Sequence, residues 1–185
     1  MMSFISYFIN GLSLGSVYAI IALGYTMVYG IAKMLNFAHG DVIMIGGYVV
    51  FTVVSTMGLP PAVGILLAVI ICTVLGVTIE KVAYRPLRMA SPLAVLITAI
   101  GVSYLLQNIA LLVFGSNPKS FTSVVTIPAL KLAGGRLTIS GETLVTIVSC
   151  IVIMIVLTTF IKKTRAGQAM LAVSEDKGAA QLMGI

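Results

Sequence analysis

Charged residues are scarce in this sequence. Only 9% of its 185 residues are charged, whereas 59% are hydrophobic. An ordinary soluble domain carries about 25% charged residues, which it needs to cover its surface. So few charges exclude a water-soluble surface, and the composition predicts an integral membrane protein.

Residues that bind metals or form disulfides are scarce as well. The chain has one histidine, five acids and two cysteines. Cys72 and Cys150 both lie in apolar runs, so we expect buried, inert thiols rather than a disulfide or a metal pair. A lone histidine without clustered ligands argues against a metal site, and no cofactor is expected. No G-x-x-x-x-G-K-[ST] loop is present, so the sequence carries no P-loop signature for binding ATP.

The net charge of +6 is carried by eleven lysines and arginines. In a soluble protein such a charge would suggest nucleic acid as a partner. In a membrane protein it more simply reflects basic residues gathered on one side of the bilayer. Membrane lipid, and no nucleic acid, is therefore the expected environment.

Five apolar runs are long enough to cross about 30 Å of hydrocarbon at 1.5 Å per residue. They cover residues of about 4–31, 40–56, 62–82, 93–114 and 142–161. The first run is predicted to be a retained span and not a cleaved signal peptide, because it is long and has no basic residue before it. The expected fold is an all-α membrane protein of about five transmembrane helices, in one transmembrane domain over residues 1–185.

Local signals predict where several of these spans begin and end. Gly58 and the two prolines after it predict a tight turn, with Pro61 opening the next helix. Ser91 before Pro92 predicts a helix cap, and Pro86 is expected to stop any helix there. In the polar loop 115–141, two alternating runs around Gly134 and Gly135 predict a short β-hairpin.

The last stretch, residues 164–185, has too few apolar residues to span a membrane. Ser174 followed by Glu175 and Asp176 predicts a helix cap with acids in the first turn. We therefore expect one short helix before Ser174 and a second after it. The alternative is a solvated linker to a further span.

The positions of the basic residues favour one orientation. With the N-terminus outside, eight lysines and arginines fall in the cytoplasm and three fall outside. The cytoplasmic set is Lys33, Lys81, Arg85, Arg88, Lys162, Lys163, Arg165 and Lys177, and the outer set is Lys119, Lys131 and Arg136. By the positive-inside rule, the hairpin is expected outside and residues 162–185 in the cytoplasm.

The segment between the first two spans has an unusual composition. It holds the only histidine, His39, and one of the five acids, Asp41. Desolvating such groups in lipid costs several kcal/mol, and glycines nearby weaken a continuous helix, so an irregular, discontinuous helix start is predicted. Two roles remain open for Asn36, His39 and Asp41. The favoured one is to satisfy backbone groups at the helix start, and the other is to form a gate at the cytoplasmic end of a transport path.

The fourth span carries an unusual number of polar side chains, namely Thr98, Ser103, Gln107 and Asn108. At helical spacing, Gly101, Tyr104 and Asn108 share one face. Hydrogen bonds between helices are the favoured explanation, and the alternative is that this face lines a transport path.

Four motifs carry a resemblance to a known family. They are LNFAHGD at residues 35–41 with Gly46, YRPLR at 84–88, GVSYLLQN at 101–108, and GQAM at 167–170 with the alanines at 179 and 180 and GI at 184–185. Together they resemble permeases of branched-chain amino acid ABC transporters, and most closely the H-type (LivH-type) subunit. Family members continue past the final Gly-Ile, so the chain resembles an N-terminal portion or a truncated form.

The resemblance implies a subunit of an importer in the bacterial inner membrane, which is not itself an enzyme. A periplasmic binding protein would deliver leucine, isoleucine or valine, a second permease subunit would complete the path, and two cytoplasmic ABC ATPases would drive it. Urea and short-amide permeases are similar too. A secondary transporter or channel is disfavoured, because the acids lie at span ends or in loops and not at the bilayer centre.

The same resemblance implies two sets of functional residues. Those expected in the path or gate are Asn36, His39, Gly40, Asp41, Gly46, Gln107 and Asn108. Those expected to couple to the ATPase are Gly167, Glu175, Asp176, Ala179, Ala180 and Gly184.

Overall fold

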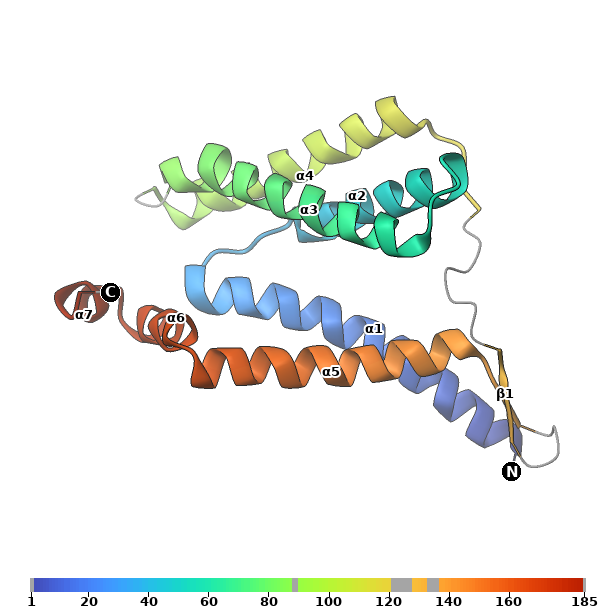
Figure 1. The fold of residues 1–185 in the computed structure, drawn as a ribbon. Helices are drawn as coiled ribbons and strands as arrows, with labels where there is room; N and C mark the ends of the chain where they lie inside the picture. The colour runs from blue at the N-terminus through green and yellow to red at the C-terminus, as the bar shows by residue number, and fades with distance from the viewer. Residues whose placement is uncertain (1, 88–89, 121–127, 133–136, 185) are drawn as a thin grey trace. The chain divides into compact units, whose positions relative to one another are not determined.

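A computed structural model describes residues 2–87, 90–120, 128–132 and 137–184 (Figure 1). The chain divides into two compact units. One unit holds residues 34–122, and the other holds residues 1–33 together with 123–185.

The described residues contain five helices long and apolar enough to cross a membrane, which confirms the expected fold class. They are α1 (Met2–Ala32), α2 (His39–Phe51), α3 (Pro61–Ile79), α4 (Pro92–Phe114) and α5 (Gly141–Lys163). Two of them continue as π-helix, α2 into η1 (Thr52–Thr56) and α3 into η2 (Glu80–Tyr84). The chain is therefore a multi-pass membrane protein.

Two helix starts in the unit 34–122 follow the local signals. Gly58 takes φ of +67°, a backbone conformation that favours glycine, and Pro61 is the first residue of α3. At α4, the Ser91 hydroxyl accepts a hydrogen bond from the Ala94 N–H at 3.4 Å, and Pro92 follows as the first helical residue. Both predictions are confirmed.

The end of the third span differs from the prediction. The sequence suggested a stop at about residue 82, but the helix runs on through η2 and the 3₁₀ turn η3 (Arg85–Leu87). In η2 the Arg85 N–H donates to Glu80 O, five residues back. In a regular α-helix the Pro86 ring would clash with the carbonyl group four residues back. The wider π turn and the 3₁₀ turn replace the hydrogen bonds between residues four apart, so proline is tolerated here.

Small residues lie at the centre of the unit 34–122. Ala38 and Ala99 are fully buried, beside Ile79, Val95 and Leu106. Side chains this small let helix backbones approach closely, which is how helices pack inside membranes. Many larger apolar side chains of the same helices remain exposed, as expected where lipid or another protein surrounds them.

In the other unit, α1 packs along α5 (Figure 1). Two short strands precede α5, β1 (Leu130–Leu132) and β2 (Leu137–Ile139), and they pair antiparallel with Leu130 opposite Ile139. The glycine turn expected between them falls in residues 133–136, outside the described residues. The hairpin turn therefore stays a prediction.

A tight elbow joins α5 to α6 (Arg165–Glu175). The Thr164 hydroxyl accepts from the Gly167 N–H at 3.0 Å and donates to Phe160 O at 2.7 Å. A Cβ at Gly167 would lie 2.5 Å from backbone atoms of Phe160 and Ile161, so only glycine fits. The elbow therefore sets the direction in which α6 leaves α5.

The break in the last stretch lies two residues later than predicted. Ser174 belongs to α6, where its hydroxyl donates to Leu171 O at 2.6 Å. Asp176 is the cap of α7 (Lys177–Leu182), and its carboxylate accepts from the N–H groups of Gly178 and Ala179. Both residue types cap helices well, and here the carboxylate takes the position while the serine bonds back to its own helix.

Gly167→Ala tests the elbow. The added methyl group overlaps the backbone at the end of α5, so we expect a lower unfolding temperature, with a cost of about 1–3 kcal/mol typical of overpacking. Gly15→Ala in α1 is the matched control, because nothing lies within 4 Å of its Cβ position. Thermal unfolding in detergent, followed by circular dichroism, measures both. Equal unfolding temperatures for the two variants would show that the elbow is not tightly packed.

Candidate functional site

The start of α2 is held by a side chain from the far end of the third span. The Tyr84 hydroxyl donates to Asn36 Oδ1 at 2.8 Å, and the Tyr84 ring lies in the buried core. This bond ties the loop before α2 to η2. Asn36 therefore fixes the geometry of the loop.

The helix start is not capped by side chains as the sequence suggested. Ala38 occupies the cap position, with no side-chain hydrogen bond. The backbone provides the first contacts, from the His39 N–H to Asn36 O at 3.3 Å and from the Val42 N–H to Ala38 O at 3.0 Å. The favoured capping role is thus wrong for the side chains of Asn36 and Asp41, which are bonded elsewhere.

Asp41 is buried, with 7% of its surface exposed, and it contacts α4. Its Oδ1 accepts from Gln107 Nε2 at 3.0 Å, and its Oδ2 accepts from the Ser103 hydroxyl. Gln107 Nε2 also donates to Ser103 Oγ at 3.2 Å. Ser103 and Gln107 lie one turn apart on the same side of α4, so both reach the same carboxylate. We call Asp41, Ser103 and Gln107 the polar triad.

The electrostatics of the polar triad are unusual for a membrane helix. Among the described residues, the Asp41 carboxylate contacts two neutral donors and no lysine or arginine. A carboxylate offers about four lone-pair positions, so it can accept more hydrogen bonds than it receives here. Asp41 also lies in the first turn of α2, where the helix dipole favours a negative charge. The triad can therefore still interact with a further hydrogen-bond donor.

A second contact joins α2 to α4 about two turns further along both helices. The rings of Tyr48 and Phe114 stack with centroids 4.2 Å apart and planes 5° apart. Such aromatic pairs contribute about 0.5–1.5 kcal/mol beyond the area they bury. Because the order of contacts is the same along both helices, α2 and α4 run parallel.

Beside the polar triad lies an exposed face with small and polar residues. Tyr104, Gln107 and Asn108 are exposed on α4, and a Cβ at Gly101 or Gly40 would meet nothing within 4 Å. Asn108 donates to Tyr104 O of its own helix at 2.7 Å, so it does not join the triad. The favoured prediction of bonds between helices therefore holds for Ser103 and Gln107 and fails for Asn108.

Gly46 serves packing between α2 and α3. A Cβ there would lie 3.0 Å from Cys72 Sγ, and the Cys72 thiol in turn donates to Val42 O at 3.5 Å. This close approach requires a very small residue on α2. Gly46 is thus separate from the polar triad, although the sequence grouped the two.

The residues expected to couple to an ATPase lie in or directly beside the last two helices. Gly167 is buried at the elbow, Glu175 ends α6, and Asp176 caps α7. Within and after α7, Ala180 is buried, Ala179 is exposed, and Gly184 takes φ of +82°. Their placement makes α6 and α7 one folded segment that carries two exposed acids at its bend.

Sequence reasoning placed Gln107 in the site but missed Ser103 and Tyr84. Ser103 was noted as one of several polar residues on the span and within the GVSYLLQN motif, and Tyr84 only within the YRPLR motif, but neither was given a role in the site. A signal was present for Ser103, because it precedes Gln107 by one turn and a buried acid needs donors. Nothing local indicated that Tyr84 would reach Asn36.

Comparison with known proteins gives consistent matches. A family model described as branched-chain amino acid transport system / permease component matches residues 7–185. The high-affinity branched-chain amino acid transport system permease protein LivH of Salmonella typhimurium is 41% identical over 98% of this chain. BraD of Pseudomonas aeruginosa, described in the same words, is 41% identical over 96% of the chain, and LivH of Escherichia coli is 40% identical over 98%.

The chain spans about three fifths of the length of these relatives, with 62% of LivH and 61% of BraD covered. No solved structure gives a significant match. The family model covers nearly the whole chain, and the helices have the length and composition of membrane spans. The chain therefore belongs to the family of permease components of branched-chain amino acid transport systems.

Proposed function

We propose that this chain is the membrane-spanning permease part of an ATP-driven ABC importer for leucine, isoleucine and valine. The observation that carries the proposal is the 41% identity to permeases named for branched-chain amino acid transport over 98% of the chain. The permease would form the translocation path and carry out no bond chemistry. ATP would be hydrolysed by separate subunits.

The polar triad and the exposed face beside it are the best candidates for part of the path. In hydrocarbon, exposed amides such as those of Gln107 and Asn108 are costly unless another protein or water contacts them. Small residues at Gly40 and Gly101 would leave room for a solute beside this face. His39, the first residue of α2, would lie with Asp41 near the cytoplasmic end of the path, at a gate.

The proposed partners are a periplasmic amino-acid-binding protein, a second permease subunit and two cytoplasmic ABC ATPases. The proposed location is the bacterial inner membrane, with the N-terminus outside and residues 162–185 in the cytoplasm. The distribution of lysines and arginines supports this orientation. In it, α6 and α7 would face the ATPase as the coupling segment.

Two alternatives concern the substrate and the energy source. The same machine could carry urea or short amides, because permeases for those solutes are similar in sequence. A secondary transporter is the other candidate, and one observation favours it. Asp41 is a buried acid within a helix apolar enough to span a membrane, and intramembrane acids mark ion pathways in many transporters.

Uptake into proteoliposomes separates these candidates. We expect vesicles with the complete permease pair, its ATPases and its binding protein to accumulate radiolabelled leucine only when ATP is supplied on the ATPase side. Urea and acetamide as competitors test the substrate class. Accumulation of leucine without ATP, driven by a proton or sodium gradient, would contradict the importer and support the secondary transporter.

Variants of the polar triad and of His39 test the path. Asp41→Asn keeps the size of the side chain but removes its charge, and we expect at least a tenfold loss of leucine uptake at equal membrane abundance, which corresponds to about 1.4 kcal/mol. His39→Ala is expected to impair uptake as well if it belongs to the gate. Thr78→Ala is the matched control, because Thr78 lies exposed on α3 and bonds only Val74 O of its own helix. Normal uptake by both variants would remove the triad and His39 from the path.

The two acids at the bend between α6 and α7 allow a test of coupling. Glu175→Lys and Asp176→Lys are expected to weaken ATPase association, because exposed acids can pair with basic groups on a partner surface. Asp176→Asn is the control for the cap, since asparagine also caps helices but carries no charge. If Asp176→Asn weakens ATPase association as much as Asp176→Lys does, the negative charge of Asp176 is required. If Asp176→Asn binds the ATPase like the parent chain, the effect of Asp176→Lys comes from the lost cap or the added positive charge. Normal co-purification and uptake with both lysine variants would reduce this segment to a linker.

A further inference from the structure

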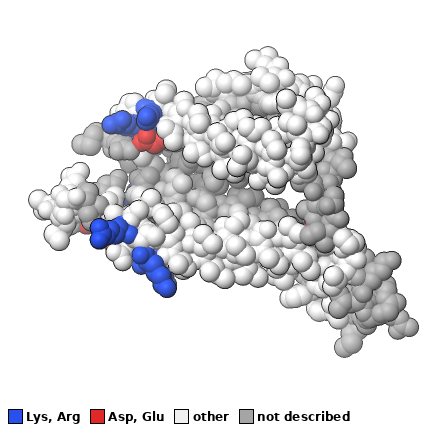
Figure 2. Space-filling view, viewed as in Figure 1, with Lys and Arg blue, Asp and Glu red and all other residues white. Residues whose placement is uncertain are grey.

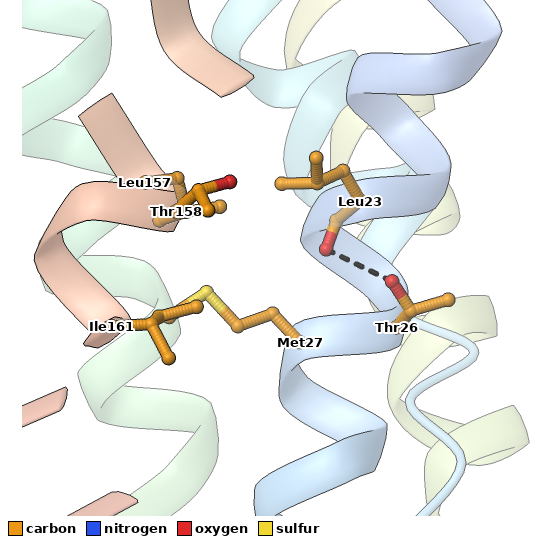
Figure 3. Close-up of a pocket in the computed structure, with 6 residues that line it drawn as sticks. All are labelled: Leu23, Thr26, Met27, Leu157, Thr158 and Ile161. Atoms are coloured by element: carbon orange, nitrogen blue, oxygen red, sulfur yellow. Dashed lines mark hydrogen bonds between the residues drawn. The ribbon is translucent and has the colours of Figure 1, made fainter. Parts of the chain in front are cut away.

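A groove runs between α1 and α5, in the unit that holds residues 1–33 and 123–185. It is lined by Leu23, Thr26, Met27, Leu157, Thr158 and Ile161 (Figure 3). The apolar side chains are half-buried and the two threonines are exposed, so the groove has an apolar floor and a rim of hydroxyl groups. The Thr26 hydroxyl donates to Leu23 O at 3.2 Å and leaves the floor apolar.

The size of the groove suits a narrow chain. Its volume is about 210 Å³, below the range of about 300–1,000 Å³ usual for pockets that enclose small-molecule ligands. Met27 extends from α1 toward Ile161 of α5 and closes the groove from below in the view of Figure 3. A flexible hydrocarbon chain fits a groove of this size, because it can lie along the apolar side chains and remain exposed to lipid on its other side.

A group of cations follows the groove at the end of α5. Ile161, its last residue on α5, is followed by Lys162 and Lys163, and Arg165 begins α6. All three are exposed, and among the described residues none of them forms an ion pair. Figure 2 shows basic side chains gathered at the end of this unit, whereas the visible surface along its helices is uncharged. α5 has 23 residues, or about 35 Å at 1.5 Å per residue, so these cations lie where the membrane meets water.

We propose that this groove and the cations at its end form a binding site for an anionic phospholipid. One acyl chain lies in the groove between α1 and α5, and the phosphate lies against Lys162 and Lys163. Basic residues at the membrane surface attract anionic headgroups, and the apolar groove holds the chain at the correct depth. Cations at the membrane–water boundary attract an anionic headgroup, which is why the charge favours a lipid over a neutral helix as the occupant.

Tryptophan fluorescence tests the site, because the chain contains no tryptophan. Thr158→Trp places a probe at the rim of the groove. Val156→Trp places a control on another face of the same helix, where Val156 is 62% exposed. The chain is reconstituted in phosphatidylcholine vesicles with a minor fraction of brominated phosphatidylglycerol, whose bromines quench nearby tryptophan.

With brominated phosphatidylglycerol, we expect the tryptophan at position 158 to be quenched more strongly than the one at position 156. With brominated phosphatidylcholine, we expect the tryptophan at position 156 to be quenched more strongly. Lys162→Gln and Lys163→Gln should each lower the preference for phosphatidylglycerol about fivefold. Lys119→Gln removes the same charge from the other unit and should leave the preference unchanged. Circular dichroism confirms that every variant keeps its helices.

Three results would overturn the proposal. Equal quenching at both positions by brominated phosphatidylglycerol would mean that only ordinary surrounding lipid is present. Protection of position 158 from both brominated lipids would mean that a protein segment, from this chain or another copy, covers the groove. A preference for phosphatidylglycerol that survives both lysine substitutions would mean that the headgroup lies elsewhere.

Discussion

Polar groups in hydrocarbon must find partners within the protein, and this constraint explains the most specific contacts of the chain. A buried carboxylate without donors would cost several kcal/mol. Asp41 avoids this cost through Ser103 and Gln107 of α4, so α2 and α4 have one favoured register. Hydrophobic burial cannot set this register in a membrane, because lipid tails are as apolar as the helix surfaces.

The same constraint applies to the backbone where helices begin, widen or turn. Ser91, Thr164 and Asp176 each accept bonds from N–H groups that have no partner in the first helical turn. In the π segment before Pro86, the backbone keeps its bonds by moving to a longer register. Small residues complete the arrangement, since Gly46 and Gly167 lie where a neighbouring atom or backbone comes too close for a side chain.

The features that the sequence allowed us to predict are local or compositional. The five spans follow from long apolar runs, and the helix starts at Pro61 and Ser91 follow from residues that act within one turn. The break near Ser174 was predicted two residues early, because serine and aspartate compete for the same role and their local preferences are similar. The partner of Asp41 lies 62 residues away along the chain, and the partner of Asn36 lies 48 residues away. Such contacts depend on how helices pack, and a single sequence carries no direct signal for them.

Two separate contacts between parallel helices limit how those helices can move. A single contact between α2 and α4 would leave them free to pivot about it. The polar triad at one end and the stacked rings of Tyr48 and Phe114 further along remove that pivot. While both contacts persist, α2 and α4 cannot rotate relative to each other and move as one rigid unit. Any motion that changes the exposed face of α4 relative to α2 must exchange the hydrogen bonds of Asp41 for others and separate the stacked rings, so part of the kinetic barrier to that motion lies in a polar contact.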